Sequence, residues 1–172
     1  LYELIAALDN INQQQLRCQL WLCGFSGVKN VSAIPDQVLQ QWQQRPDINW
    51  LGPTDQIEEL YAQVDCVVLP SYREGMPRTL LEAGAMGLPV IATNVPGCRN
   101  IVTDGDNGLL CEARDIDSLQ AAMQAMLAMS PEQRQAMGAA GRRRVEQDFD
   151  EALVVNEALA VVAEINGNKS FS

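Results

Sequence analysis

Residues 69–100 read LPSYREGMPRTLLEAGAMGLPVIATNVPGCRN, and this stretch decides the fold of the chain. It begins at the end of an apolar run, 66–69, of the kind that is buried on both faces of a parallel sheet. A helix is expected over 77–86, because proline is well tolerated in a first helical turn, and the apolar residues 90–93 then form another strand. A strand, a helix and a strand in this order predict a parallel sheet with the helix crossing over one of its faces.

The rest of the chain continues this alternation, so we expect an α/β, Rossmann-like three-layer fold: a parallel sheet with helices on both faces. One domain is expected over 1–165, followed by a frayed tail over 166–172. In open sheets of this kind, ligands bind beyond the carboxyl ends of the strands. The expected helices are the opening segment, 35–44, 54–63, 77–86, 115–129, 131–147 and 150–165. The expected strands are 16–24, 48–51, 66–69, 90–93 and 109–111, with turns at 24–27 and 107–108 and a loop at 94–100.

Charge and composition exclude several classes of function. The chain carries 22 acidic against 12 basic residues, a net charge of −10, and a field of this sign repels nucleic acid and anionic lipid surfaces. The basic run from Arg142 to Arg144 is interpreted as a solvated helix face. The sequence contains no histidine, which excludes serine–histidine nucleophiles, histidine general bases and H-E-x-x-H zinc sites. Any chemistry must therefore use carboxylates, Lys, Arg, Tyr, Cys, backbone amides or a cofactor.

The five cysteines are an odd number without any C-x-x-C pair, which argues against a zinc site and against a disulfide framework. Cys18, Cys23 and Cys66 lie in or beside apolar runs, where we expect them to act as small buried apolar residues. A reducing, cytoplasmic compartment is therefore expected. No apolar run reaches the roughly 18 residues of a membrane-spanning helix, and no signal-peptide pattern opens the sequence.

The junction Glu74-Gly75-Met76-Pro77 lies where the expected strand passes into the expected helix. Gly75 lets the backbone approach a ligand closely, and Pro77 suits the start of a helix. The free amides at a helix start, together with the positive end of its dipole, form an anion site for which diphosphate is the usual ligand. An ordinary strand-to-helix turn is the alternative that this junction alone leaves open.

Glu82 is the second candidate, because it lies on a helix with hardly any other polar residue. A carboxylate on a mostly buried helix is costly unless it is hydrogen-bonded, and sugar hydroxyls would supply such bonds. The alternative is a capping box, in which Glu82 bonds back to the Thr79 amide. Glu74 in the loop and Glu82 about one turn inside the helix are spaced to hold two parts of one extended ligand across the phosphate site.

Taken as a whole, the segment 69–100 resembles the retaining glycosyltransferases of family 4, also called group 1. Their signature sets an E-x7-E motif in a pattern like P-S-x-x-E-G-x-P-x-x-L-L-E-A-x-A-x-G-x-P-V-I-A-T-x-x-x-G. Outside the signature, the strand end Leu51-Gly52, the segment from Leu60 to Asp65 and the turn from Asp104 to Leu110 are also similar to the family. The matching residues within the signature are Pro70, Ser71, Glu74, Gly75, Pro77, Leu80, Leu81, Glu82, Ala83, Ala85, Gly87, Pro89, Val90, Ile91, Ala92, Thr93 and Gly97.

The resemblance implies the C-terminal, donor-binding half of the two-domain GT-B fold, acting on a UDP-sugar or a GDP-sugar without an obligatory metal. Carried over from the family, Glu74 lies near the donor sugar as the catalytic residue, and Glu82 holds the ribose. Helix amides and basic side chains would meet the phosphate charge. The backbone that would face the diphosphate is at Gly75, Met76, Arg78 and Thr79, and the loop at Gly52 and Pro53 would border the base.

Two departures from the family pattern limit what this chain is expected to do alone. Asn100 stands where the family often has Glu, which leaves the role of its loop open. The sequence starts without Met and inside a helix, so the preceding strand and turn, with their diphosphate-neutralising Arg and Lys, are expected to be missing, as is the N-terminal acceptor domain. The segment alone is therefore expected to be inactive. The whole enzyme would act on a glycan or lipid-linked acceptor, and any attachment to the inner face of a membrane would come from the missing domain.

Other classes of function stay open on the sequence alone. A sugar-nucleotide epimerase of the GT-B fold usually employs histidine in its cleft, and this chain has none. A non-catalytic nucleotide-binding module or a receiver-like partner domain is a third alternative. A receiver needs an acidic residue at the carboxyl end of a strand, whereas Asp65 lies at the start of one. A dehydrogenase is disfavoured, because Gly24-Phe25-Ser26-Gly27 lacks the G-x-G-x-x-G spacing.

Overall fold

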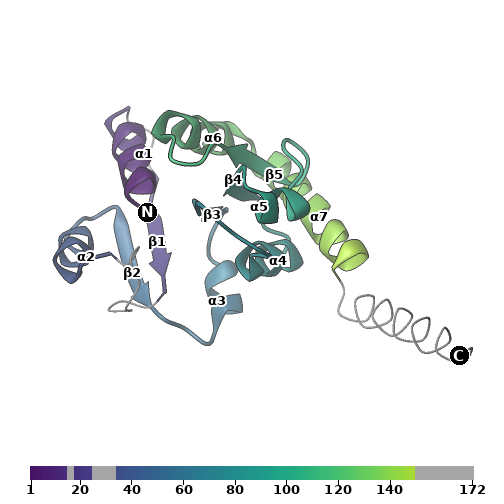
Figure 1. Cartoon of the computed structure of the whole chain (residues 1–172), viewed down its shortest axis with the longest axis horizontal. Helices are drawn as coiled ribbons and strands as arrows, with labels where there is room; N and C mark the ends of the chain where they lie inside the picture. The colour runs from purple at the N-terminus through teal and green to yellow at the C-terminus, as the bar shows by residue number, and fades with distance from the viewer. Residues whose placement is uncertain (15–17, 25–33, 150–172) are drawn as a thin grey trace, which may run out of the picture.

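The computed structural model describes residues 1–14, 18–24 and 34–149 of the chain (Figure 1). The expected helix at 150–165, the tail at 166–172 and most of the turn at 24–27 lie outside these residues and stay predictions. The helices are α1 (Tyr2–Gln13), α2 (Asp36–Gln43), α3 (Ile57–Tyr61), α4 (Arg78–Ala85), α5 (Pro96–Ile101), α6 (Ile116–Ala128) and α7 (Pro131–Asp148). The strands are β1 (Leu20–Cys23), β2 (Ile48–Gly52), β3 (Val67–Leu69), β4 (Val90–Thr93) and β5 (Gly108–Cys111).

All pairs of these strands are parallel, and in the described part of the chain they form two sheets, β1–β2 and β3–β4–β5. Strand β4 is fully buried at the centre of the larger sheet, and its side chains alternate between the two faces. Ile91 packs in one core cluster with α1 and α6, whereas Val90 and Ala92 pack in another with α4 and α5. Figure 1 shows α1 and α6 on one side of the strands and α3 and α4 on the other. The predicted α/β class, with parallel strands and helices on both faces, is confirmed.

Helix α1 holds the two sheets side by side. Its residues Leu4 and Ile11 pack in the same cluster as Ile91 of β4, and Leu8 packs in the same cluster as Leu22 of β1. Among the described residues, β1 pairs only with β2 and β3 only with β4, so each sheet ends in an apolar strand without a charged side chain. Natural edge strands are usually protected by charge or covered by further structure. The expected sheet is thus divided between β1 and β3.

The segment 94–100, expected as a loop, contains most of helix α5, so this prediction is wrong. Pro96 occupies the first turn of this helix, where its missing amide hydrogen costs nothing. Cys98 and Ile101 are buried against α4 in the same core cluster. A short polar segment with Gly and Pro is typical of a loop, but burial of one apolar face stabilises a helix here.

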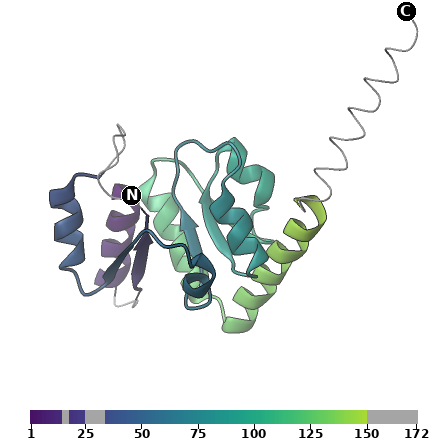
Figure 2. The ribbon, with the colours of Figure 1, turned by 90° about the horizontal axis from the view of Figure 1, so that it is seen from below.

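Helix α7 is the last described helix and lies at the end of the described structure opposite to α2 (Figure 2). It begins with a capping box, in which the Ser130 amide donates to the Gln133 side chain at 2.8 Å and the Gln133 amide to the Ser130 hydroxyl at 3.3 Å. Arg142 and Arg143 are exposed, as expected for a solvated face. The interpretation is wrong for Arg144, whose guanidinium donates to the Thr103 hydroxyl and the Asn100 carbonyl, both at 3.0 Å. Neither α7 nor another described helix combines the length and apolar character of a membrane span.

The cysteines are all free thiols. Cys98 and Cys111 are buried, and Cys18 and Cys66 are half-buried at the starts of β1 and β3. Cys23 is exposed, so its expected burial is wrong. Successive side chains of a strand point to opposite faces, and Cys23, at the carboxyl end of β1, points away from the core. Its thiol donates to a backbone carbonyl at the end of β2 at 3.2 Å.

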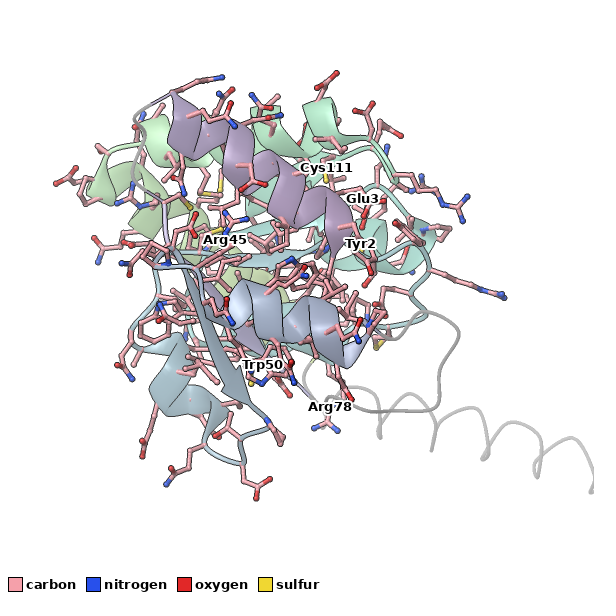
Figure 3. The ribbon with its side chains drawn as sticks, turned by 90° about the vertical axis from the view of Figure 1, so that its left-hand side faces the viewer. Tyr2, Glu3, Arg45, Trp50, Arg78 and Cys111 are labelled. Carbon is pink, nitrogen blue, oxygen red and sulfur yellow. The ribbon has the colours of Figure 1, made fainter. Side chains whose placement is uncertain are left out.

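An ion-pair network ties α1 to the start of β2. Arg45, labelled in Figure 3, donates to both carboxylate oxygens of Asp47 at 3.0 and 2.8 Å and also pairs with Asp9 of α1 at 2.5 Å. The Asn12 side chain donates to Asp47 at 2.8 Å. The hydrogen bonds from Arg45 are the main reason why the pKa of Asp47 is lowered in the folded chain.

The pKa of Asp47 is lower in the folded than in the unfolded state. Its contribution to the free energy of unfolding is therefore fully present above the unfolded pKa of about 3.9 and is lost as the pH falls through the folded pKa. Asp47→Asn should therefore lower the free energy of unfolding by about 1–2 kcal/mol at pH 7, and by less at pH 3. Urea unfolding at both pH values measures this difference. Asp106→Asn, on an exposed turn, is the matched control and should change little. A cost that is equal at both pH values would contradict an ionic role.

Candidate functional site

The site forms where β3 passes into α4, at the carboxyl edge of the larger sheet. Helix α4 begins at Arg78, with buried Pro77 as its N-cap. The Leu80 amide is the first to donate to the Pro77 carbonyl, at 3.1 Å. The amides of Arg78 and Thr79 precede it in the first turn, where the helix itself offers no acceptor. The predicted helix start is therefore present, and the Arg78 and Thr79 amides have no acceptor within the helix; the binding of an anion there stays a prediction.

Gly75 and Met76 lie just ahead of the helix and are both exposed. Met76 is 60% exposed although it is apolar, so the other described residues leave the surface at the helix start uncovered. The Arg78 side chain is 88% exposed and extends into solvent, as Figure 3 shows. An exposed guanidinium next to amides without helical acceptors can meet an added anion without breaking an interaction in the core.

Glu82 lies one turn inside α4, with its side chain 37% exposed. The Tyr61 hydroxyl at the end of α3 donates to Oε2 of Glu82 at 3.4 Å, and the Arg78 guanidinium lies 3.7 Å from Oε1. Thr79 is the second residue of the helix rather than its N-cap, so a capping box between Thr79 and Glu82 is absent. Glu82 thus faces α3 and the solvent.

Tyr61 orients Glu82 and was not among the predicted site residues. The phenol is only 6% exposed, and burial is the main reason why its pKa is raised, with the Glu82 charge adding to the effect. A buried phenol that keeps its proton at neutral pH is a fixed hydrogen-bond donor. It holds one carboxylate oxygen of Glu82, and the other lies 3.7 Å from the Arg78 guanidinium.

The loop at Gly52 and Pro53 lies on the same side of the site as Glu82. Gly52 ends β2 with a left-handed φ of +70°, and its carbonyl accepts the Cys23 thiol at 3.2 Å. The exposed Pro53 leads from β2 into α3, whose last residue Tyr61 contacts Glu82.

Glu74 lies on the other side of the helix start, above α5. Its side chain is half-buried. Burial, with the Glu74 charge nearby, raises the pKa of the Cys98 thiol to about 11. Gly97 of α5, next to Cys98, lies against the carbonyl oxygens of Glu74 and Gly75, so α5 packs on the loop that carries Glu74. The two predicted acids thus flank the start of α4: Glu74 on the α5 side and Glu82 on the α3 side.

A second group of contacts holds the loop before Glu74. The Tyr72 hydroxyl donates to the carboxylate of Glu3 on α1, and the Arg114 guanidinium lies 4.9 Å from the centre of the Tyr72 ring. This hydrogen bond is the main reason why the pKa of Glu3 is lowered. Glu3 and Tyr72 are 69 residues apart, so no local pattern in the sequence could indicate the contact.

The described residues form an α/β domain in which two carboxylates lie near an exposed helix start. Among the described residues no group of three or more His, Cys, Asp or Glu side chains is placed to hold a metal ion. Residues 1–144 match the family described as "Glycosyl transferases group 1", and the chain therefore belongs to the group 1 glycosyltransferases.

Relatives and solved structures agree with this membership. The chain is 35% identical over 103 residues to a glycogen synthase of Mycobacterium tuberculosis, covering 59% of this chain and 25% of that protein. A sucrose-phosphate synthase from Thermosynechococcus elongatus superposes with a TM-score of 0.83 at 26% identity, over 96% of this chain and 42% of that one. Anabaena HepE in complex with UDP and glucose shares the fold, with a TM-score of 0.76 at 22% identity over 95% and 44%. The chain spans less than half the length of these proteins.

Proposed function

We propose that this chain is the donor-binding part of a retaining glycosyltransferase of family 4, which transfers a sugar from a nucleoside-diphosphate sugar to a glycan or a lipid-linked acceptor. The observation that carries the proposal is the placement of Glu74 and Glu82 on opposite sides of the exposed start of α4. An extended anionic ligand laid across that start would meet a carboxylate at each end and amides in the middle.

In this arrangement each predicted residue has one role. The diphosphate lies against the amides of Gly75, Met76, Arg78 and Thr79, with the Arg78 side chain closing over it. Glu82, oriented by Tyr61, accepts the ribose hydroxyls, and the loop at Gly52 and Pro53 borders the base. Glu74 lies beside the sugar, where a negative charge stabilises the positive charge that develops during glycosyl transfer.

The donor is proposed to be a UDP-sugar or a GDP-sugar, with UDP placed first because Anabaena HepE is solved with UDP and glucose. No obligatory metal is proposed, because the helix amides and basic side chains supply the positive field. Nucleic acid is not proposed as a partner, given the net charge of −10.

The acceptor would be bound by a further domain of the same polypeptide. Two observations support this part of the proposal. The chain spans 25–44% of the three proteins named above, and among the described residues β1 and β3 each pair with a single strand and so leave an apolar edge unpaired. One more parallel strand between β1 and β3 would join the sheets into one. We propose a cytoplasmic location for the whole enzyme, with any membrane contact made by the further domain.

Titration of this chain with UDP, GDP and their sugars, followed by amide NMR, tests the donor site. UDP or GDP should shift the amide signals of Gly75, Met76, Arg78 and Thr79, whereas uridine or guanosine without phosphate should not. Shifts confined to other regions would contradict the site. In the complete polypeptide, release of nucleoside diphosphate only with an acceptor supports transfer, whereas an epimerised sugar nucleotide without acceptor would contradict it.

A further inference from the structure

Gly97, in the first turn of α5, packs directly on the backbone of the loop that carries Glu74. A Cβ atom added at Gly97 would overlap the carbonyl oxygens of Glu74 and Gly75 and would lie 2.7 Å from the carbonyl carbon of Glu74. These are main-chain atoms, so no side-chain rotation relieves the overlap. Any residue larger than glycine at this position must displace the loop or α5.

Two further contacts lie beneath the same loop. Thr93, at the end of β4, is 2% exposed, and its hydroxyl lies within hydrogen-bond distance of the carbonyls of Leu69 (3.2 Å) and Ser71. The Cys98 side chain, next to Gly97, is fully buried under Glu74. The loop therefore contacts β4 at its beginning and α5 at Glu74. The main-chain contact with α5 sets the distance between this helix and the loop.

We propose that Gly97 and Thr93 are positioning residues for Glu74, with α5 serving as the platform that sets the distance between this carboxylate and the sugar of the donor. The inference rests on the proposed function, because Glu74 is taken to lie beside the sugar. It adds that selectivity for the sugar portion depends on the packing of α5 against the loop that carries Glu74. Glu82, held by Tyr61 on the opposite side of α4, is independent of this platform.

Gly97→Ala should lift the loop and separate sugar recognition from nucleotide recognition. In the free chain the amide signals of Glu74 and Gly75 should move. The preference for UDP-glucose over UDP should fall at least fivefold, because a misplacement of about 1 Å at a reacting group is costly. The affinity for UDP itself should fall by a smaller factor, because of the proposed diphosphate ligands only the Gly75 amide lies in the displaced loop and the Glu82 side is unchanged. Both affinities are measured on the same preparation by titration.

Gly108→Ala is the matched control. Gly108 is also a buried glycine, and a Cβ there would lie 2.7 Å from the Val90 carbonyl oxygen and 2.6 Å from its Cγ2. It begins β5, at the end of the sheet opposite to the Glu74 loop. This variant should lower the melting temperature without moving the Glu74 and Gly75 signals or the preference for UDP-glucose.

Thr93→Val keeps the proposal testable if Gly97→Ala does not fold. It conserves volume but removes the hydroxyl contacts to the Leu69 and Ser71 carbonyls, so the loop signals should move and the preference should fall in the same direction by a smaller factor. Folded variants at both positions with parental loop signals and a parental preference would overturn the proposal. If the unchanged chain binds neither UDP nor UDP-glucose, the donor site fails, while the loop signals of the two variants still decide the positioning role.

Discussion

Gly138→Ala should lower the free energy of unfolding by about 3 kcal/mol, one of the two largest effects expected for this chain. Helix α7 crosses α4 so closely that a Cβ at Gly138 would overlap the Gly87 carbonyl oxygen and lie 2.6 Å from its carbonyl carbon. Gly87 cannot yield, because it ends α4 with a left-handed φ of +71° and its amide donates to the Gly84 carbonyl at 2.8 Å. The helix would have to move away from the sheet, and buried contacts would be lost.

The control for this prediction lies one turn further along the same helix. A Cβ at Gly141 would have its nearest neighbour at 3.7 Å, the Cα of Gly84, which is an ordinary contact. Gly141→Ala should therefore be neutral or stabilising by up to about 1 kcal/mol, because alanine is the better helix former. Urea unfolding of the two variants measures the difference. Equal effects at Gly138 and Gly141 would show that α7 does not approach α4 as described.

Much of this fold could be predicted because its signals are local. The continuous apolar runs that became β3 and β4, and the proline ahead of α4, each specify structure within a few residues. The short helices were predicted less well: α3 covers only Ile57–Tyr61, and α5 was missed entirely. A helix of five or six residues has little propensity of its own, so its extent depends on packing that one sequence does not reveal.

The candidate site, like the fold, could be predicted only where its signals are local. Glu74 and Glu82 belong to one strand–helix junction, so their spacing indicated that they would flank one helix start. Their supports come from elsewhere: Tyr61 is 21 residues from Glu82, and the Thr93 hydroxyl is 22 residues from the Ser71 carbonyl that it meets. Contacts of this range depend on the strand order and the helix crossing, and these arise only when the chain has folded.

The two acids are held in position by different kinds of contact. Glu82 depends on a side-chain hydrogen bond from another helix, which a substitution at either end can weaken by degrees. The Glu74 loop depends on main-chain packing against α5, which tolerates almost no change. The nucleotide side of the site is therefore expected to adapt more readily than the sugar side.

Glu74→Gln and Glu82→Gln should each lower the activity of the complete polypeptide at least tenfold, through different kinetic constants. Gln at 82 keeps the shape of the side chain but loses the charge that strengthens bonds to ribose hydroxyls, so KM for the nucleotide sugar should rise about tenfold with kcat little changed. Gln at 74 removes a charge that acts when positive charge develops on the sugar, so kcat should fall about a hundredfold at nearly constant KM. Steady-state kinetics with varied donor measure both constants.

Glu58→Gln, on the exposed face of α3, removes the same charge from the same surface without touching the helix start and should leave both constants near those of the parent. This control separates a specific role from the general effect of one fewer negative charge on the approach of an anionic donor, which would act equally at all three positions. Near-normal turnover in both site variants would refute the assignment of Glu74 and Glu82. A rise in KM for Glu74→Gln with unchanged kcat would instead place Glu74 on the nucleotide, because an interaction present equally in the ground state and the transition state affects binding alone.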